Sequence, residues 1–332
     1  MQQKPQTQRS GKIVILVIIG IVILLLTGRF FLLKNDPSIR IQAPSHFGAP
    51  LDTGKITVHG ASLGRILFND PILSRHQKTS CASCHQQGAA YADLQKSNSV
   101  GDLGHKTSRN SPVLTNLIWK SYFFQDGRAT TLKETILNAI RDTNELNSDI
   151  DLILDRLNNQ HLYQEKFQRI TKREKIEASD LLSVLSQYLR TLNSWNTRYD
   201  EMMLGKAFFS GEERKGWTIF QEHCQSCHSA PFFTTQTGHV VAGSGADLGM
   251  YIHSHKEEDR YRFMSPTLRN IQYSAPYMHD GRFDDLRGLL RFHGDPINTP
   301  GMGKKLTDSE VSSVISFLKT LSDKAFISTS SY

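Results

Sequence analysis

The sequence has few cysteines, few alternating strand patterns and only one long hydrophobic run. All four cysteines fall within two short motifs, so the rest of the chain has none for disulfides. The scarcity of alternating apolar and polar residues argues against a sheet-based fold and favours a mainly α-helical one. No basic stripe interleaved with aromatic residues is present, so we expect no nucleic-acid partner.

Acidic residues are missing from the first 34 positions, which hold five basic residues. The formal net charge of +7 therefore comes mostly from the N-terminus, and the remainder of the chain is close to neutral. This distribution again argues against an extended nucleic-acid surface.

The long hydrophobic run covers Ile13 to Gly28 and continues from Phe30 to Leu33. About 20 apolar residues suffice to span a bilayer as a helix, and the basic residues before the run predict a cytoplasmic N-terminus. A cleaved signal peptide is the alternative, but no small-x-small site follows the run directly. We therefore predict that residues 1–34 form a tail and an inner-membrane anchor, with the rest of the chain periplasmic.

Beyond the anchor, Pro- and Gly-containing residues 35–50 predict a linker. The apolar spacing predicts helices over Ser179–Met203, Glu212–His223 and Thr307–Leu321. Thr307 and Glu310 form a capping box at the start of the last helix.

An imperfect internal repeat divides the folded part of the chain. Cys81-Ala-Ser-Cys84-His85 recurs as Cys224-Gln-Ser-Cys227-His228. An Arg-Asn turn and an Asp-Gly-Arg turn then follow each copy, in the same order. We therefore expect two related domains over 51–205 and 206–325, and a tail over 326–332.

The repeated C-x-x-C-His motif is the attachment signature of a c-type haem. Two thiols at this spacing reach the two vinyl groups of one porphyrin, and the next imidazole binds its iron. Zinc sites, thioredoxin-like pairs and disulfides explain two copies ending in His less well. The sequence predicts two covalently bound haem c groups, held by Cys81, Cys84 and His85 and by Cys224, Cys227 and His228.

The chain resembles the bacterial di-haem cytochrome c peroxidase family, which includes the methylamine-utilisation di-haem enzymes that oxidise a partner protein. The resemblance runs from about Leu51 to Leu321 and rests on six ordered motifs: Leu63–Phe68, Ser80–His85, Arg109–Pro112, Phe124–Arg128, Tyr188–Leu192 and Pro266–Arg282. It implies two class I cytochrome c domains behind the transmembrane helix. It also implies reduction of hydrogen peroxide at the first haem, with electrons from a small cytochrome c or copper protein relayed by the second.

The resemblance also assigns site residues. His85 and His228 become the proximal iron ligands, and Glu145 becomes the carboxylate that moves a proton between the peroxide oxygens. A lone Glu near a helix end is usually only solvated, so this role depends on its motif position. A calcium ion would be bound by the Asn110 side chain and the carbonyls of Ser274 and Pro276.

Three positions depart from the family pattern. The family's tryptophan between the haems is Gln125 here, so Trp119, Tyr122 or direct tunnelling must replace it. A distal glutamine falls on Thr135. The removable His ligand of peroxidases that need reductive activation falls on Asp102. Either the loop shifts and His105 binds the first iron, or that haem is permanently open.

The sixth ligand of the second haem lies fourteen residues after His279 in the resembling families. This count reaches His293, and we predict bis-histidine ligation there. A His before Gly can also simply end a helix, and Met302 is a second candidate ligand. His239 is a weaker candidate for lining the second haem pocket.

Two other functions stay open at this stage. One is a peroxide-dependent oxidase that modifies a partner protein, against which Gln125 counts. The other is an electron-carrying cytochrome without catalysis, against which Glu145 counts. A homodimer is a further expectation.

Overall fold

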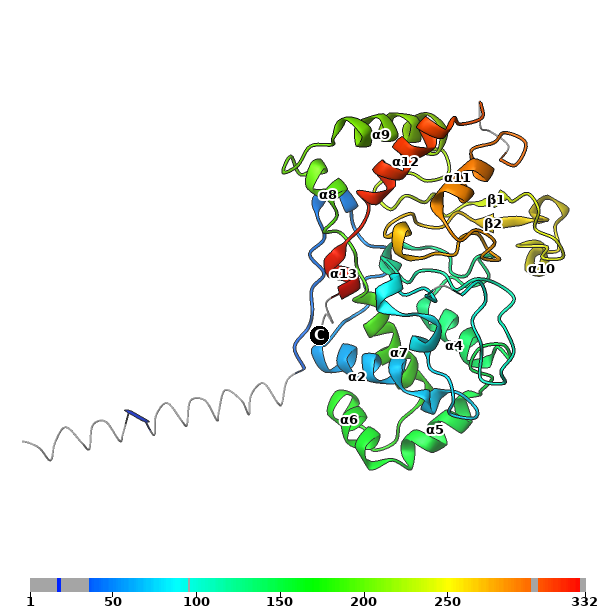
Figure 1. Cartoon of the computed structure of the whole chain (residues 1–332). Helices are drawn as coiled ribbons and strands as arrows, with labels where there is room; N and C mark the ends of the chain where they lie inside the picture. Colours follow the sequence, from blue (N-terminus) through cyan, green and yellow to red (C-terminus); the bar gives the residue numbers. More distant parts are fainter. Residues whose placement is uncertain (1–16, 19–35, 95, 300–303, 329–332) are drawn as a thin grey trace, which may run out of the picture.

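The computed structural model describes residues 17–18, 36–94, 96–299 and 304–328, and it is mainly helical (Figure 1). The lower half in Figure 1 contains α2 (Val58–Asn69), α3 (Cys81–Cys84), α4 (Leu132–Arg141), α5 (Ile150–Asn158), α6 (His161–Thr171) and α7 (Ala178–Arg190). The chain then forms α8 (Arg198–Met203), α9 (Gly211–His223), α10 (Tyr251–Ser254), α11 (Leu286–His293), α12 (Asp308–Lys319) and α13 (Lys324–Ser328). Within the described residues the only sheet pairs β1 (Gly238–Val240) antiparallel with β2 (Arg262–Met264).

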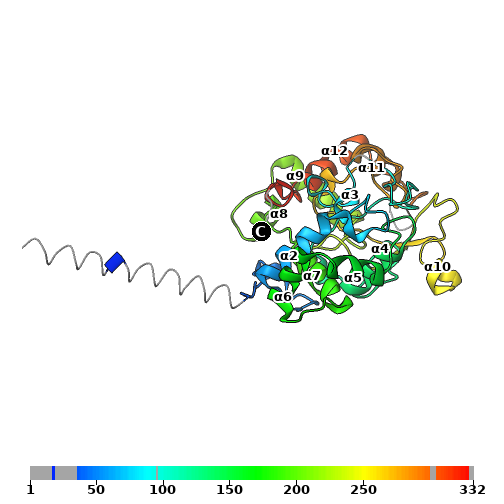
Figure 2. The ribbon, with the colours of Figure 1, turned by 90° about the horizontal axis from the view of Figure 1, so that it is seen from below.

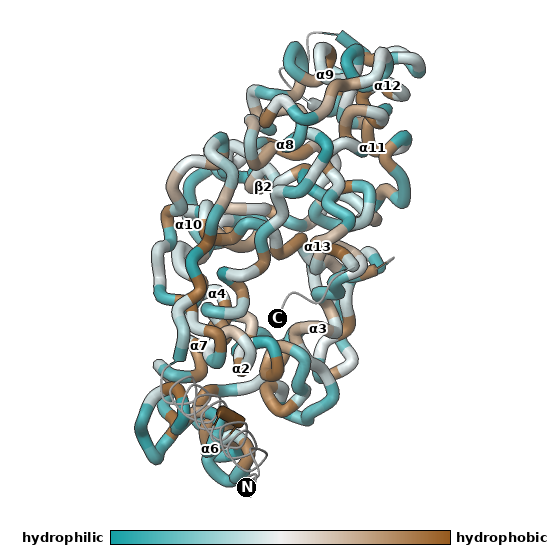
Figure 3. Tube along the Cα trace, turned by 90° about the vertical axis from the view of Figure 1, so that its left-hand side faces the viewer, coloured by the Kyte–Doolittle hydropathy of each residue, from teal (hydrophilic) through white to brown (hydrophobic). Residues whose placement is uncertain are grey.

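Two hydrophobic cores correspond to the two halves of the chain. The first is built mainly from α2 and α4–α7, and the second from α9, α11 and α12. Figure 3 shows hydrophobic residues distributed over both halves. Phe326, in the segment predicted to be a tail, is buried in the first core. The predicted domain boundaries themselves stay predictions.

Each core has one close helix pair that depends on a glycine. A Cβ on Gly64 of α2 would lie 2.0 Å from the Val184 carbonyl oxygen of α7. A Cβ on Gly216 of α9 would lie 1.9 Å from the Ser313 carbonyl oxygen of α12. The two halves therefore repeat the same arrangement, in which an early helix lies directly against a late one. Figure 2 shows the first pair from below.

The single helix predicted over Ser179–Met203 is wrong, because α7 ends at Arg190 and α8 begins at Arg198. The backbone between them bonds to other segments instead of continuing a helix. The Ser194 amide donates to the Asn116 side chain at 2.8 Å, and the Trp195 amide donates to Asp323 at 3.1 Å. The capping box of Thr307 and Glu310 on α12 is confirmed.

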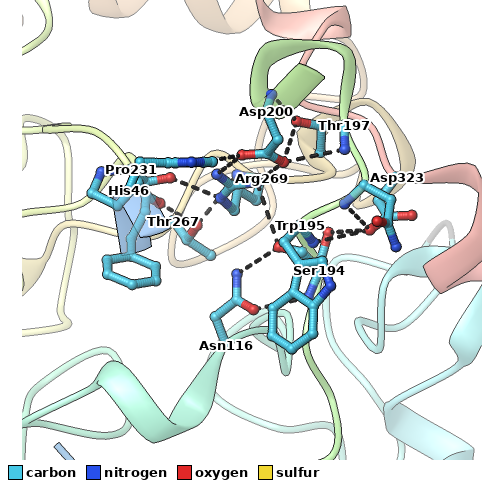
Figure 4. A network of polar contacts seen from close by, with 12 residues as sticks. His46, Asn116, Ser194, Trp195, Thr197, Asp200, Pro231, Thr267, Arg269 and Asp323 are labelled. Atoms are coloured by element: carbon cyan, nitrogen blue, oxygen red, sulfur yellow. Dashed lines mark hydrogen bonds and ion pairs between the residues drawn. The ribbon is translucent and has the colours of Figure 1, made fainter. Parts of the chain in front are cut away.

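A buried ion pair lies where this connecting segment meets the second half (Figure 4). Arg269 is fully buried, and its two terminal nitrogens donate to the two carboxylate oxygens of Asp200 at 2.9 and 2.7 Å. His46 bonds to the same carboxylate at 2.9 Å. The segment predicted to be a linker is therefore attached to the molecule's interior.

Phe47 extends this attachment into an aromatic cluster. Its ring lies within 5.1–6.2 Å of the rings of Trp119, Trp195 and Phe232. These rings come from the first half, the connecting segment and the second half respectively. The cluster stabilises the junction between the two halves.

The predicted N-terminal anchor requires a correction. In the described part of the chain no helix is long and apolar enough to cross a bilayer. Apart from Val17 and Ile18, the predicted segment lies outside the described residues. The transmembrane helix and the anchored, inner-membrane location are not supported.

Candidate functional site

The first C-x-x-C-His motif is organised around α3. Ser80 and Ser83 form a capping box, so the helix begins at Cys81. The His85 amide donates to the Cys81 carbonyl at 3.0 Å, and its ring Nδ1 lies 2.7 Å from the Tyr91 carbonyl oxygen. Since a carbonyl can only accept, Nδ1 carries the hydrogen and Nε2 is left as the metal-binding atom.

The second motif repeats this chemistry at the end of α9. The His228 amide donates to the Cys224 carbonyl at 2.9 Å. Its Nδ1 lies 3.1 Å from the Phe233 carbonyl oxygen and 3.2 Å from that of Pro266. Burial and then the charge of His293 lower the pKa of His228 to about 4. The imidazole is therefore neutral, as metal ligation requires.

All four cysteine thiols are unpaired. Each motif therefore presents two free thiols and a neutral imidazole whose Nδ1 is already hydrogen-bonded. This donor set fits a covalently attached haem at both motifs.

Glu145 lies in the turn between α4 and α5, close to the first motif. Burial and then the charge of Glu145 raise the pKa of Cys81 to about 12, so the carboxylate lies near this thiol. The Glu145 side chain is half-buried. Burial and the charge of Asp142 raise the pKa of Glu145 to about 7, against the opposing charge of Arg128. Such a group both accepts and donates a proton near neutral pH.

His105 and Asp102 lie in the loop beside Glu145 but differ in environment. His105 is exposed, and only its backbone carbonyl takes part in the loop, as an acceptor from Gly101 at 2.9 Å. Asp102 is buried and bonds to His76 through its carboxylate. His105 as an iron ligand stays a prediction that no contact of its side chain supports.

His293 ends α11 next to Gly294. Its Nδ1 lies 3.1 Å from the Thr299 hydroxyl oxygen, and Nε2 can bind a metal when Nδ1 donates in this contact. The influence of His293 on the pKa of His228 shows that the two imidazoles lie close together. His239 is near the same place, with Nδ1 3.5 Å from the Cys227 sulfur. Met302 lies outside the described residues.

The internal repeat is visible in the local structure. Two left-handed asparagines, Asn116 and Asn270, each precede a 3-10 turn. Paired backbone bridges then follow, Phe123 with Ala129 and Tyr277 with Phe283, before α4 and α11 begin. The same spacing relates every pair. Asn270 therefore corresponds to Asn116.

In this register the position of His293 on α11 corresponds to Ala139 on α4. An alanine has no metal-binding group. The two haem sites therefore differ at the place where a ligand opposite the proximal histidine would come from.

Among the predicted calcium ligands, Asn110 hydrogen-bonds to other segments of the chain. The Asn110 amide nitrogen donates to the Lys96 and Ser97 carbonyls at 3.0 and 3.2 Å, and its backbone amide donates to the His279 carbonyl at 2.7 Å. Ser274 ends a 3-10 turn two residues before Pro276. The calcium site stays a prediction.

The positions that depart from the family pattern have structural roles. Gln125 spans the two halves, because its side chain donates to the Asn110 carbonyl at 3.0 Å and its own carbonyl accepts from the Met264 amide at 2.7 Å. The Thr135 hydroxyl donates to the Thr131 carbonyl within α4. Trp119 is buried in the aromatic cluster, whereas Tyr122 is exposed.

Sequence reasoning missed the ionic contacts around the Asp-Gly-Arg turn. Asp126 accepts from Arg109 at 2.6 Å and from Arg128 at 2.8 Å. Arg109 also bonds to Asp247 of the second half at 2.7 Å. The motif order alone contained a signal for Arg109 and Asp126, but nothing in the sequence indicated Asp247.

Residues 59–208 match the di-haem cytochrome c peroxidase family, and residues 213–322 match the cytochrome c family. The methylamine utilization protein MauG of Methylorubrum extorquens is 31% identical over 71% of this chain and 68% of its own length. The cytochrome c551 peroxidase of Pseudomonas aeruginosa is 28% identical over 79% of this chain and 78% of its own length.

Two solved structures show the same fold. A MauG-like protein associated with microbial copper homeostasis has a TM-score of 0.80 at 24% identity, over 88% of this chain and 98% of that one. The diheme peroxidase BthA from Burkholderia thailandensis has a TM-score of 0.73 at 20% identity, over 89% of this chain and 92% of that one.

Proposed function

This chain belongs to the di-haem cytochrome c peroxidase family that also contains MauG, and from that premise we propose that it reduces hydrogen peroxide to water. The family implies two covalently bound haem c groups, which the two motifs fit. We assign peroxide to the first haem and electron relay to the second. The electrons come from a small cytochrome c or copper protein.

The difference between Ala139 and His293 supports this assignment of roles. At the position that corresponds to His293 the first half has Ala139, which cannot bind a metal, whereas His293 lies near His228 and can. Haem bound at the two motifs would supply the redox chemistry of peroxide reduction. One site is therefore suited to bind substrate and the other to pass electrons on.

The observation that carries the proposal is the carboxylate of Glu145. Its pKa of about 7 lets it take a proton from one peroxide oxygen and return that proton to the other, which leaves as water. Overall, hydrogen peroxide, two electrons and two protons yield two molecules of water. Glu145 moves protons without being consumed.

The test is Glu145→Gln in the haem-loaded protein, with peroxide and a reduced donor. The amide keeps the size of the side chain but cannot accept the proton, so turnover should fall by about two to four orders of magnitude. The visible spectrum should stay that of a protein with two haems per chain. Unchanged turnover at full haem content would contradict the proposal.

The 31% identity with a MauG favours one second candidate, peroxide-dependent oxidation of a partner protein. Gln125 counts against it, because an amide cannot carry an electron hole between the haems as an indole can. If small reduced donors support no turnover while a partner protein is oxidised by peroxide, this candidate replaces the first.

A further inference from the structure

The backbone around Glu145 is held by two separate loops. The Glu145 carbonyl accepts from the Asp102 amide at 2.8 Å, and the next carbonyl, of Leu146, accepts from the Arg75 amide at 3.0 Å. The Glu145 amide donates to the Asp142 carbonyl at 3.0 Å. Three consecutive bonds thus fix the peptide groups on both sides of the carboxylate-bearing Cα.

Asp102 also joins these two loops through its side chain. Its carboxylate is buried and accepts from the His76 amide at 3.0 and 3.2 Å and from the Lys78 amide at 3.4 Å. The His76 ring Nδ1 lies 2.6 Å from the same carboxylate. Asp102 therefore holds the segment that supplies the Arg75 amide, while its own amide holds Glu145.

The loop that contains Gly101 and Asp102 packs closely against the turn that contains Glu145. A Cβ on Gly101 would lie 2.1 Å from the Asn144 carbonyl oxygen and 2.7 Å from that of Glu145. Only glycine permits this approach. The loop closes on itself through bonds from Gly101 to the His105 carbonyl and from Gly104 to the Gly101 carbonyl, both 2.9 Å.

We infer that Asp102 is a positioning residue for Glu145, acting through the backbone of both loops. The inference rests on the proposed function, since it assumes that Glu145 moves the proton. A displaced Glu145 would misplace its carboxylate relative to the peroxide. It would also become better solvated.

The charged and titratable groups that face Glu145 are Asp142, Arg128 and the thiols of Cys81 and Cys84. Asp102 acts by hydrogen bonding and not as one of these charges. A change at Asp102 should therefore alter the pH dependence of activity only by altering how Glu145 is buried.

The experiment compares haem-loaded Asp102→Asn, Glu145→Gln and the double variant. The matched control is Asp151→Asn, which removes the same charge from the exposed side of α5. Asp102→Asn should lower kcat by about ten- to a hundredfold, the size expected for a misplaced catalytic group, with KM changed less than threefold. Its pH profile should shift to lower pH, and Asp151→Asn should match the wild type.

Two further measurements separate positioning from general damage. In the Glu145→Gln background, Asp102→Asn should cause no additional loss of kcat, because there is no longer a carboxylate to position. Hydrogen exchange at the Arg75 and Asp102 amides should become faster in Asp102→Asn. Gly101→Ala, which displaces the same carbonyls without removing a charge, should reproduce the loss of kcat and the pH shift if Asp102→Asn fails to retain haem.

Wild-type kcat and pH profile in both Asp102→Asn and Gly101→Ala, with Glu145→Gln inactive, would overturn the inference and leave the proposed function standing. An additional loss of kcat in the double variant would also overturn it. Full activity of Glu145→Gln would instead remove the proposed function, and the inference with it.

Discussion

At the scale of single residues, His85 and His228 carry the same contact from Nδ1 to a backbone carbonyl. That bond fixes the tautomer and leaves Nε2 for iron. The motif spacing predicted both histidines, because thiols and imidazole must reach one porphyrin together. The carbonyl partners, Tyr91 and Phe233, follow from how the chain turns after each motif, which spacing does not encode.

Glu145 and Asp102 show the limit of prediction at this scale. Motif position singled out Glu145, but its burial depends on loops distant in sequence. The sequence singled out Asp102 only as the position at which the removable His ligand of the resembling peroxidases is absent. Its contacts with His76 and Lys78 could not be found, because they depend on how two loops pack.

The raised pKa of Glu145 predicts a pH dependence of peroxide reduction. Because the ionised carboxylate must accept the first proton, kcat/KM should fall about tenfold for each pH unit below about 7. The measurement is kcat/KM from pH 5 to 9 at constant ionic strength. The limb near pH 7 should disappear in Glu145→Gln, and a wild-type profile flat across this range would contradict the assignment.

The ligand of the second haem can be tested by His293→Met. A thioether raises a haem's reduction potential relative to imidazole, so the low-spin haem should shift to higher potential and acquire a thioether-to-iron band in the far red. Potentiometric titration followed by near-infrared spectroscopy checks this. If the wild type already shows that band, and His293→Ala keeps it, Met302 is the ligand and His293 is not.

At the scale of elements, the helices α7, α9 and α12 were predicted more reliably in type than in extent. Apolar periodicity and capping residues are local signals, so the start of α12 was correct. The break after α7 is not local. It arises because the peptide groups around Ser194 bond to Asn116 and Asp323, which are far away in sequence.

The close helix pairs predict a large effect from a small substitution. Gly64→Ala and Gly216→Ala each place a methyl group within about 2 Å of a backbone oxygen, so each should lower the free energy of unfolding by about 1–3 kcal/mol through overpacking. Denaturant unfolding of the haem-loaded protein measures this. Gly211→Ala, also in α9 but with nothing near its Cβ position, is the control, and equal stability of all three would contradict the packing account.

At the scale of the whole molecule, the junction between the halves contains the guanidinium of Arg269, which is buried away from solvent. Asp200→Asn leaves Arg269 buried without a negative partner, so the free energy of unfolding should fall by about 3–5 kcal/mol. The control is Asp308→Asn at an exposed pair with Arg291, which should cost less than about 1 kcal/mol. A loss at Asp200 no larger than at Asp308 would show that the buried pair does not stabilise the junction.

The two-haem plan of the molecule could be predicted from the sequence, whereas the way its halves join could not. Two motif copies and a repeated order of turns are sequence patterns. The contacts of His46, Phe47 and Phe326 with distant segments are not. The predicted anchor is not supported, because no helix among the described residues could cross a bilayer. The homodimer and the calcium ion stay predictions.

The central claim is that the two haem sites have different jobs, an open one beside Glu145 and Ala139 and a closed one at His293. An EPR spectrum of the resting, fully oxidised protein with two haems per chain tests this most directly. The account predicts one high-spin ferric signal and one low-spin signal of bis-histidine type, with only the high-spin signal changed by a small exogenous ligand. Two low-spin signals, neither of them altered by that ligand, would contradict it.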